Sequence, residues 1–284
     1  VVTGPRQTGK TTAIKQAVKV AGLPVRVASA DEAAELGSDW VETQWRQARA
    51  LTRGNEKAVL VIDEIQKVSQ WSEVVKRLWD EDSWNDVPLL VILSGSSSLL
   101  LGNGLTESLA GRYELLRSTH WGLSEMSEAF GYSLEDYLEF GGYPGAAILK
   151  GDENRWREYM RDSIIEATIS RDVLQMEDVR KPALMRALFE LGAQYSAQEL
   201  SYRKILGQLD DKGNTDTVKH YLDLLSGAGM MSGLQKFDDK PIRAKASSPR
   251  LMVHDPALMT SMWHGKGSLL SDSDLRGHLV ETAV

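Results

Sequence analysis

Residues 4–11 read GPRQTGKT, which fits the pattern G-x-x-x-x-G-K-[ST] of a phosphate-binding loop. Glycine at both ends permits backbone conformations closed to residues with a Cβ, so consecutive N–H groups can point inward at phosphate oxygens. The residues that follow place Ala13, Ile14, Ala17, Val18 and Ala21 on one helical face, and the positive helix N-terminus would face the same phosphates. The motif therefore predicts a strand at residues 1–3, a tight turn and a helix over residues 10–21.

This loop predicts a site for a nucleoside triphosphate and magnesium. Lys10 would reach the β- and γ-phosphates, and the Thr11 hydroxyl would ligate Mg²⁺. The alternative is a glycine-rich turn that only caps a helix. The residues expected to bind the nucleotide are Gly4, Pro5, Arg6, Gln7, Thr8, Gly9, Lys10, Thr11 and Thr12.

Short apolar runs alternate with helical stretches through residues 1–120. The runs lie at 1–3, 25–28, 58–62, 87–93 and 113–117. Runs without polar alternation are typical of strands buried on both faces, and intervening helices imply right-handed crossovers in a parallel sheet. Asp39 and Glu42 could cap the helix that carries Trp40 and Trp45. We predict a three-layer α/β fold of the P-loop NTPase type.

The run AVLVIDEIQ at residues 58–66 supplies the second half of the predicted site. A buried strand ends there at the carboxyl edge of the sheet, where open α/β folds bind ligands. Asp63 would hold Mg²⁺, and Glu64 would orient and deprotonate the attacking water. On its own such an acidic pair can be an inconsequential turn. Behind a phosphate loop it favours hydrolysis, and the absence of an N-K-x-D signature favours ATP over GTP.

Two further residues have competing interpretations. Ser94 follows the apolar run at 87–93 and could sense the γ-phosphate, or it could simply belong to a serine-rich turn. Arg112 precedes the fifth run and could stabilise transition-state charge at a neighbouring subunit's nucleotide, or it could be a solvated surface arginine.

Composition limits the remaining function classes. The 284 residues carry a net charge of −7, so any contact with nucleic acid must come from a local patch. Cysteine is absent, which excludes disulfides and cysteine-based zinc sites or nucleophiles. The longest apolar runs are far shorter than the roughly 20 residues that span a bilayer, and no signal peptide is visible. We therefore expect no membrane contact and a cytoplasmic location.

From about residue 124 the pattern becomes helical, interrupted by the breaker GGYPG at residues 141–145. Helices are expected at 182–195, 197–209 and 215–226, followed by two weak strand-like segments, which together predict a winged helix. Residues 201–250 hold nine Lys or Arg against six Asp, a net charge of +3. Weak DNA binding and protein packing both remain open. The candidate DNA contacts are Thr217, Lys219, His220, Lys240, Arg243, Lys245 and Arg250, with Asp216 and Asp223 opposing them.

The order of seven motifs along the chain resembles that in prokaryotic AAA-type ATPases of the archaeal-ATPase-like group. The motifs are GPRQTGKTT, VLVIDEIQKVSQW, LSGSSSLLL, LAGRYELL, FGGYPGAAI, RLMVHDPALM and GHLVETAV. The resemblance implies an ATPase core over 1–122, a helical lid over 123–180, a winged helix over 181–262 and the start of a nuclease-like tail over 263–284. It also implies a first strand clipped at its start and a tail largely outside this chain, with Glu281 the one candidate nuclease carboxylate. RSTHWGLSE replaces the Pro-Leu step usual in the family. The expected function is an ATP-driven switch of the lid and winged helix. The alternative is an ATP-regulated DNA-binding or protein-interaction module with little turnover.

Overall fold

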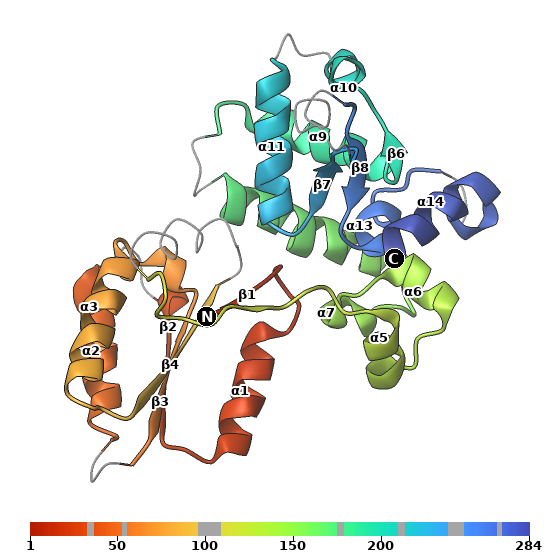
Figure 1. The fold of residues 1–284 in the computed structure, drawn as a ribbon. Coiled ribbons are helices and arrows are strands. Elements are labelled where there is room, and N and C mark those ends of the chain that lie inside the picture. The colour runs from red at the N-terminus through yellow and green to blue at the C-terminus, as the bar shows by residue number, and fades with distance from the viewer. Residues whose placement is uncertain are drawn as a thin grey trace. The chain divides into compact units, whose positions relative to one another are not determined.

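The computed structural model describes residues 1–32, 37–52, 56–95, 109–174, 179–209, 214–237, 247–265 and 269–284. These residues form two compact units (Figure 1). Unit 1 comprises Val1–Gly4 and Gly9–Ser118, and unit 2 comprises Pro5–Thr8 and Thr119–Val284. The predicted boundaries at 122, 180 and 262 stay predictions. No helix in the described ranges is long and apolar enough to cross a membrane.

Unit 1 is a parallel five-stranded sheet with helices on both faces (Figure 1), which confirms the α/β fold. The strand order is β2-β3-β4-β1-β5. The strands are β1 (Val2–Thr3), β2 (Val25–Ser29), β3 (Ala58–Asp63), β4 (Leu89–Gly95) and β5 (Leu116–Arg117). The helices are α1 (Lys10–Ala21), α2 (Ser38–Arg49) and α3 (Trp71–Trp84), with short 3-10 turns at Ala30–Glu32 and Ile65–Lys67.

Alternating residues of the interior strand β3 pack against opposite helices. Leu60 and Ile62 lie in a core with Trp45 of α2 and Leu78 of α3. Val59 and Val61 instead join a smaller core around Ile14 of α1. This two-sided burial explains why the β3 sequence is apolar without interruption.

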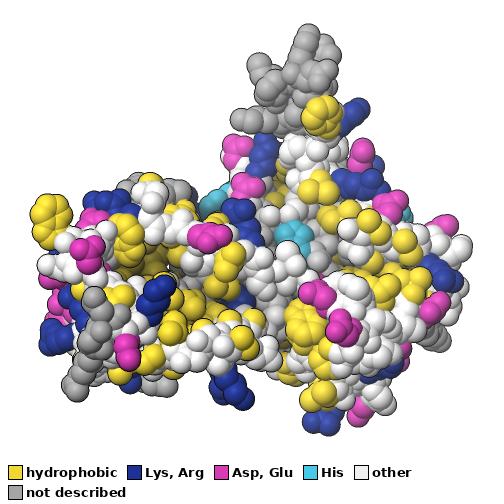
Figure 2. Space-filling view, turned by 60° about the horizontal axis from the view of Figure 1, so that its bottom comes forward, with side chains coloured by type: hydrophobic (Ala, Val, Ile, Leu, Met, Phe, Trp, Pro, Cys, Tyr) yellow, Lys and Arg dark blue, Asp and Glu magenta, His cyan; other side chains and the backbone are white. Residues whose placement is uncertain are grey.

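The α1 face of the sheet is incompletely covered near β2, the edge strand. Val25 pairs in register with Val59, which pairs with Leu90, so the three side chains share that face. Val25, Val27 and Leu90 are 39%, 58% and 51% exposed. Figure 2 shows hydrophobic side chains reaching the surface of unit 1 among charged ones. We call Val25, Val27 and Leu90 the β2 patch.

Unit 2 is mainly helical and holds a three-stranded antiparallel sheet ordered β6-β8-β7. Its strands are β6 (Gln198–Glu199), β7 (Met231–Leu234) and β8 (Arg250–Val253). The helices are α5 (Leu123–Phe130), α6 (Leu134–Phe140), α7 (Pro144–Ala147), α8 (Glu153–Tyr159), α9 (Pro182–Gln194), α10 (Tyr202–Gln208), α11 (Thr215–Gly227), α13 (Pro256–Thr260) and α14 (Ser273–Ala283), with a 3-10 turn at Leu269–Ser271. After α8 the chain continues as π-helix over Met160–Glu166 and Thr168–Val173.

Several predicted boundaries were wrong. The helix expected at 197–209 is divided into β6 and α10, because Ala197 has a positive φ of 63° and the Ser201 hydroxyl caps a helix that starts only at Tyr202. Helix α2 begins at Ser38 after Gly37, so Asp39 lies in its first turn and is not its cap. The fifth strand covers only Leu116–Arg117 of the run predicted at 113–117.

The glycines of GGYPG fit around Asp255, a carboxylate that is 1% exposed. Asp255 Oδ2 accepts a hydrogen bond of 2.8 Å from the Gly142 N–H, and Oδ1 accepts one of 2.8 Å from the Ala257 N–H. A Cβ on Gly141 would collide with Asp255 Oδ1, and one on Gly142 would collide with the Trp121 carbonyl oxygen. The segment therefore packs closely against Asp255 and Trp121, in addition to breaking the helix as its composition predicts.

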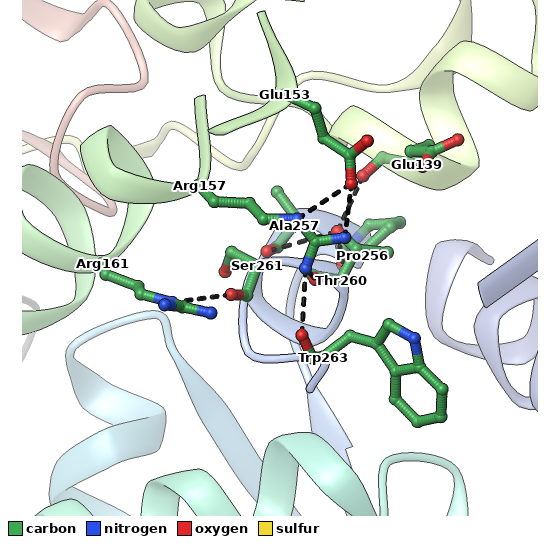
Figure 3. A network of polar contacts seen from close by, with 9 residues as sticks. All are labelled: Glu139, Glu153, Arg157, Arg161, Pro256, Ala257, Thr260, Ser261 and Trp263. Carbon is green, nitrogen blue, oxygen red and sulfur yellow. Dashed lines mark hydrogen bonds and ion pairs between the residues drawn. The ribbon is translucent and has the colours of Figure 1, made fainter. Parts of the chain in front are cut away.

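Two arginines bind the carbonyls at the end of α13 (Figure 3). Arg157 Nη1 donates to the Thr260 and Trp263 carbonyls at 2.9 and 3.0 Å, while its other nitrogens bind Glu153. Arg161 Nε donates to the Ser261 carbonyl at 2.9 Å. The last carbonyls of a helix lack the usual intrahelical partners, so these cations supply donors where the helix itself supplies few.

Candidate nucleotide-binding site

The loop between β1 and α1 has the backbone that its sequence predicts. Gly4 has a φ of 156°, and a Cβ there would collide with the Ser118 carbonyl oxygen. Gly9 has a φ of 87° and directly precedes α1. Lys10 is 8% exposed, and its Nζ donates to the Gly4 carbonyl oxygen at 3.0 Å. The lysine ammonium is thus held at the start of the loop, where it can meet phosphate oxygens.

Sheet topology brings three predicted site residues to one edge. Strand β4 lies between β1 and β3, with Ser94 paired to Val2 and Leu93 paired to Ile62. Because all these strands are parallel, their carboxyl ends meet at the same edge of the sheet. Gly4 directly after β1, Asp63 at the end of β3 and Ser94 in β4 are therefore neighbours in space although distant in sequence.

Asp63 is the centre of a hydrogen-bonded cluster. Its Oδ2 accepts a hydrogen bond of 2.8 Å from the Thr11 hydroxyl. Its Oδ1 accepts one of 2.5 Å from the Ser94 hydroxyl and one of 3.1 Å from the Glu64 N–H. Ser94 is fully buried. Carboxylate and hydroxyl oxygens are ligands that Mg²⁺ prefers, so Thr11 and Asp63 fit the predicted metal role.

Glu64 follows Asp63 in a left-handed conformation, with φ 55° and ψ 37°. One of its carboxylate oxygens, Oε2, accepts a hydrogen bond of 2.5 Å from the Gln66 side-chain amide. Gln66 is not among the site residues predicted from the sequence. Its signal was present in the motif DEIQ, because a single 3-10 turn brings the second residue after Glu64 back to it.

Arg112 binds groups of α3. Its Nε and Nη2 donate to Asp80 at 2.7 and 3.3 Å, and its guanidinium lies 5.9 Å from the Trp79 ring centroid. The hydrogen bond from Arg112 lowers the pKa of Asp80 from its usual value. This arrangement fits the surface interpretation of Arg112, and its action on a neighbouring subunit stays a prediction.

Trp121, from the segment RSTHWGLSE, contacts Thr8 in the middle of the phosphate-binding loop. Both residues belong to unit 2. Its indole Nε1 donates to the Thr8 carbonyl oxygen at 3.0 Å. The Trp121 N–H donates to the Gly142 carbonyl at 3.1 Å, and its own carbonyl accepts from the Tyr137 hydroxyl at 3.1 Å. Trp121 is not among the site residues predicted from the sequence, where its segment differs from the family pattern.

Several predicted residues are already engaged or lie elsewhere. Lys219 pairs with Asp216 at 3.9 Å and lies over the Tyr202 ring. Arg250 binds the Ala197 carbonyl and Glu281. The remaining candidate DNA contacts of the hairpin, Lys240, Arg243 and Lys245, lie outside the described residues.

Two family models match the chain. Residues 1–127 match an AAA domain, and residues 131–270 match a domain of unknown function. An uncharacterized protein of Methanocaldococcus jannaschii is 27% identical over 79% of this chain and 51% of its own length. One of Mycobacterium tuberculosis is 28% identical over 91% of this chain and 54% of its own length. The chain thus spans about half the length of these curated relatives.

Solved structures also align with the chain. A RuvB variant of Thermotoga maritima has a TM-score of 0.41 at 18% identity, covering 82% of this chain and 80% of that one. Cdc6p of Pyrobaculum aerophilum has a TM-score of 0.41 at 11% identity, covering 83% and 80%.

The glycine-rich loop, the strand order and the Asp63 cluster agree with the family match of this part of the chain. Unit 1 has the α/β fold of a P-loop NTPase, and residues 1–127 are similar to an AAA domain.

Proposed function

We propose that the chain binds Mg·ATP and hydrolyses it to drive a conformational switch in the remainder of the protein. The observation that carries the proposal is the cluster at the sheet edge, where Thr11 and Ser94 both donate to Asp63 and Glu64 follows directly. Lys10 would neutralise charge on the β- and γ-phosphates, while Thr11 and Asp63 would hold Mg²⁺. The ion, when bound, supplies charge stabilisation to the phosphates.

In the proposed reaction, Glu64 accepts a proton from water as the water oxygen bonds to the γ-phosphorus. The bond from that phosphorus to the β–γ bridging oxygen breaks, and ADP leaves. Ser94 and the Glu64 N–H keep Asp63 oriented through its Oδ1. Asp63 is therefore fixed before the nucleotide arrives, which limits the reorganisation needed for reaction.

The test uses two variants with opposite expected effects. Glu64→Gln should retain ATP affinity while phosphate release falls by about 10²–10⁴-fold, because only the proton acceptor is lost. Lys10→Ala should lose nucleotide affinity itself, measured by calorimetry with ATP and Mg²⁺. The exposed residues Glu56 and Lys15 provide the matched controls Glu56→Gln and Lys15→Ala. Normal turnover in Glu64→Gln would refute the hydrolytic assignment.

We further propose that part of unit 2 is a winged helix. The element order α9, β6, α10, α11, β7 and β8, with the strands in one antiparallel sheet, supports this proposal.

DNA binding by this region is the second candidate function, and the local net charge of +3 over residues 201–250 is the observation that favours it. Lys219 and Arg250 already have acidic partners, so few phosphates would be neutralised. Fluorescence anisotropy with duplex DNA should therefore give weak affinity with a shallow dependence on salt. Tight binding at physiological salt that is lost in Lys219→Gln would instead favour DNA as a partner.

A further inference from the structure

Gln66 makes a hydrogen bond that the proposed reaction does not yet use. Its Nε2 donates to Glu64 Oε2 at 2.5 Å, across the single turn Ile65–Lys67. Glu64 enters this turn with a positive φ of 55°, a conformation that non-glycine residues adopt uncommonly. The backbone conformation of Glu64 and the hydrogen bond from Gln66 together restrict where the Glu64 carboxylate lies.

The two polar atoms of the Gln66 amide have different environments. The nitrogen faces the carboxylate, which is the favourable orientation because an amide oxygen there would face another acceptor. The oxygen, Oε1, is buried and meets no hydrogen-bond donor among the described residues. The amide is therefore not held by a second polar network, and its one hydrogen bond within the described chain is to Glu64.

An apolar side chain of similar length would fill the same space without burying an unpaired oxygen. Buried polar atoms without partners are rare and destabilising, so packing alone does not explain an amide at this position. The hydrogen bond from the amide nitrogen to Glu64 does explain why an amide is present. A glutamine cannot supply this N–H donor without also burying its amide oxygen.

We propose that Gln66 is a positioning residue for hydrolysis, whose amide donates to Glu64 and fixes its carboxylate for proton transfer from the attacking water. This inference rests on the proposed function of Glu64. Donation from Gln66 Nε2 to Oε2 restricts the rotation of the Glu64 carboxylate, so that the carboxylate is oriented before the water reacts.

Two substitutions separate positioning from packing. Gln66→Met keeps the length and apolar stem of the side chain but removes the donor. Phosphate release should fall by about ten- to a hundred-fold in kcat, the loss expected of a misplaced catalytic group, with KM and ATP affinity little changed. Gln66→Glu replaces the donor by a carboxylate, which can only accept hydrogen bonds and repels Glu64. The value of kcat should therefore fall at least as far as in Gln66→Met.

The matched control is Gln47→Met, which changes an exposed glutamine of α2 in the same way. Thermal unfolding of all variants checks that the fold is kept. The inference is overturned if Gln66→Met or Gln66→Glu turns over ATP with a normal kcat. Failure of the underlying function would look different, because Glu64→Gln would then hydrolyse ATP at the normal rate.

Discussion

Asp255 is a fully buried carboxylate whose surroundings set its protonation. Burial raises its pKa from 3.8 to about 7, although the N–H groups of Gly142 and Ala257 both favour the charged form. Tyr132, Tyr137 and Tyr143 also feel this carboxylate. Burial, with Asp255 adding to it, raises the pKa of Tyr132 and of Tyr137 to about 12 and that of Tyr143 well above its usual value. The tyrosines stay neutral where Asp255 titrates.

This carboxylate predicts a pH dependence with a definite sign. Since its folded pKa exceeds its unfolded pKa, the folded state binds the proton more tightly, and the contribution to stability falls as pH rises from about 4 to about 7. The slope approaches about 1.4 kcal/mol per pH unit inside that window. Asp255→Asn removes the titration, and its amide can accept only one of the two N–H groups. Urea unfolding should show the advantage of the wild type over the variant shrinking as pH rises to 7 and levelling above it. Parallel stability curves would contradict the assignment.

Sequence predicts the site residues that belong to short motifs and misses those that depend on tertiary contacts. Lys10, Thr11 and Asp63 follow from local patterns, because the turn before a helix and the end of a strand fix where such residues lie. In the sequence, Asp255 followed by Pro256 is typical of a turn or a helix start. It does cap α13 through Ala257, but its bond to Gly142 joins residues 113 positions apart. No local pattern encodes that distance.

The short helix α13 depends on its neighbours at the scale of elements. With five residues it is too short to be stable alone, and its carbonyl end is bound by Arg157 and Arg161 (Figure 3). The Thr260 hydroxyl adds a hydrogen bond of 2.7 Å to the Glu139 carbonyl, the residue before the end of α6.

Removing the Arg157 guanidinium should therefore destabilise unit 2. Arg157→Met keeps the apolar stem but leaves the Thr260 and Trp263 carbonyls without their charged donor, a loss of about 1.5–3 kcal/mol. Arg155→Met is the control, because Arg155 lies on the same helix and is exposed. Thermal unfolding should show a clear drop of the midpoint for Arg157→Met and almost none for the control. Equal midpoints for the two variants would show that the arginine contacts contribute little.

Element types were easier to predict than element ends. The strongly periodic stretches gave α1, α9 and α11 nearly in full, since an apolar stripe at helical spacing has few other solutions. Wrong ends occur where one backbone angle decides, as at Ala197, whose positive φ separates β6 from the preceding helix. A residue whose backbone is held at a positive φ by tertiary contacts leaves no periodic pattern in the sequence.

At the scale of the whole molecule, we predict that ATPase activity needs more than one copy of the chain. Arg112 is bound to Asp80 and Trp79 within its own chain, so action on a second copy would require it to exchange that ion pair. We expect specific ATPase activity to rise with protein concentration. Mixing inactive Arg112→Ala and Glu64→Gln chains should restore some turnover, because each can supply the residue that the other lacks. Concentration-independent activity from a monomer would assign Arg112 to the surface interpretation.

The β2 patch has a consequence for how the protein behaves when handled. An edge strand presents unpaired N–H and C=O groups, and β2 adds exposed valines to them. Such an edge is a template on which an unfolded or partly folded chain can add a strand. We therefore expect preparations of the unit 1 residues alone to precipitate slowly when they are concentrated. The single substitution Val27→Lys should prevent another chain from pairing with β2.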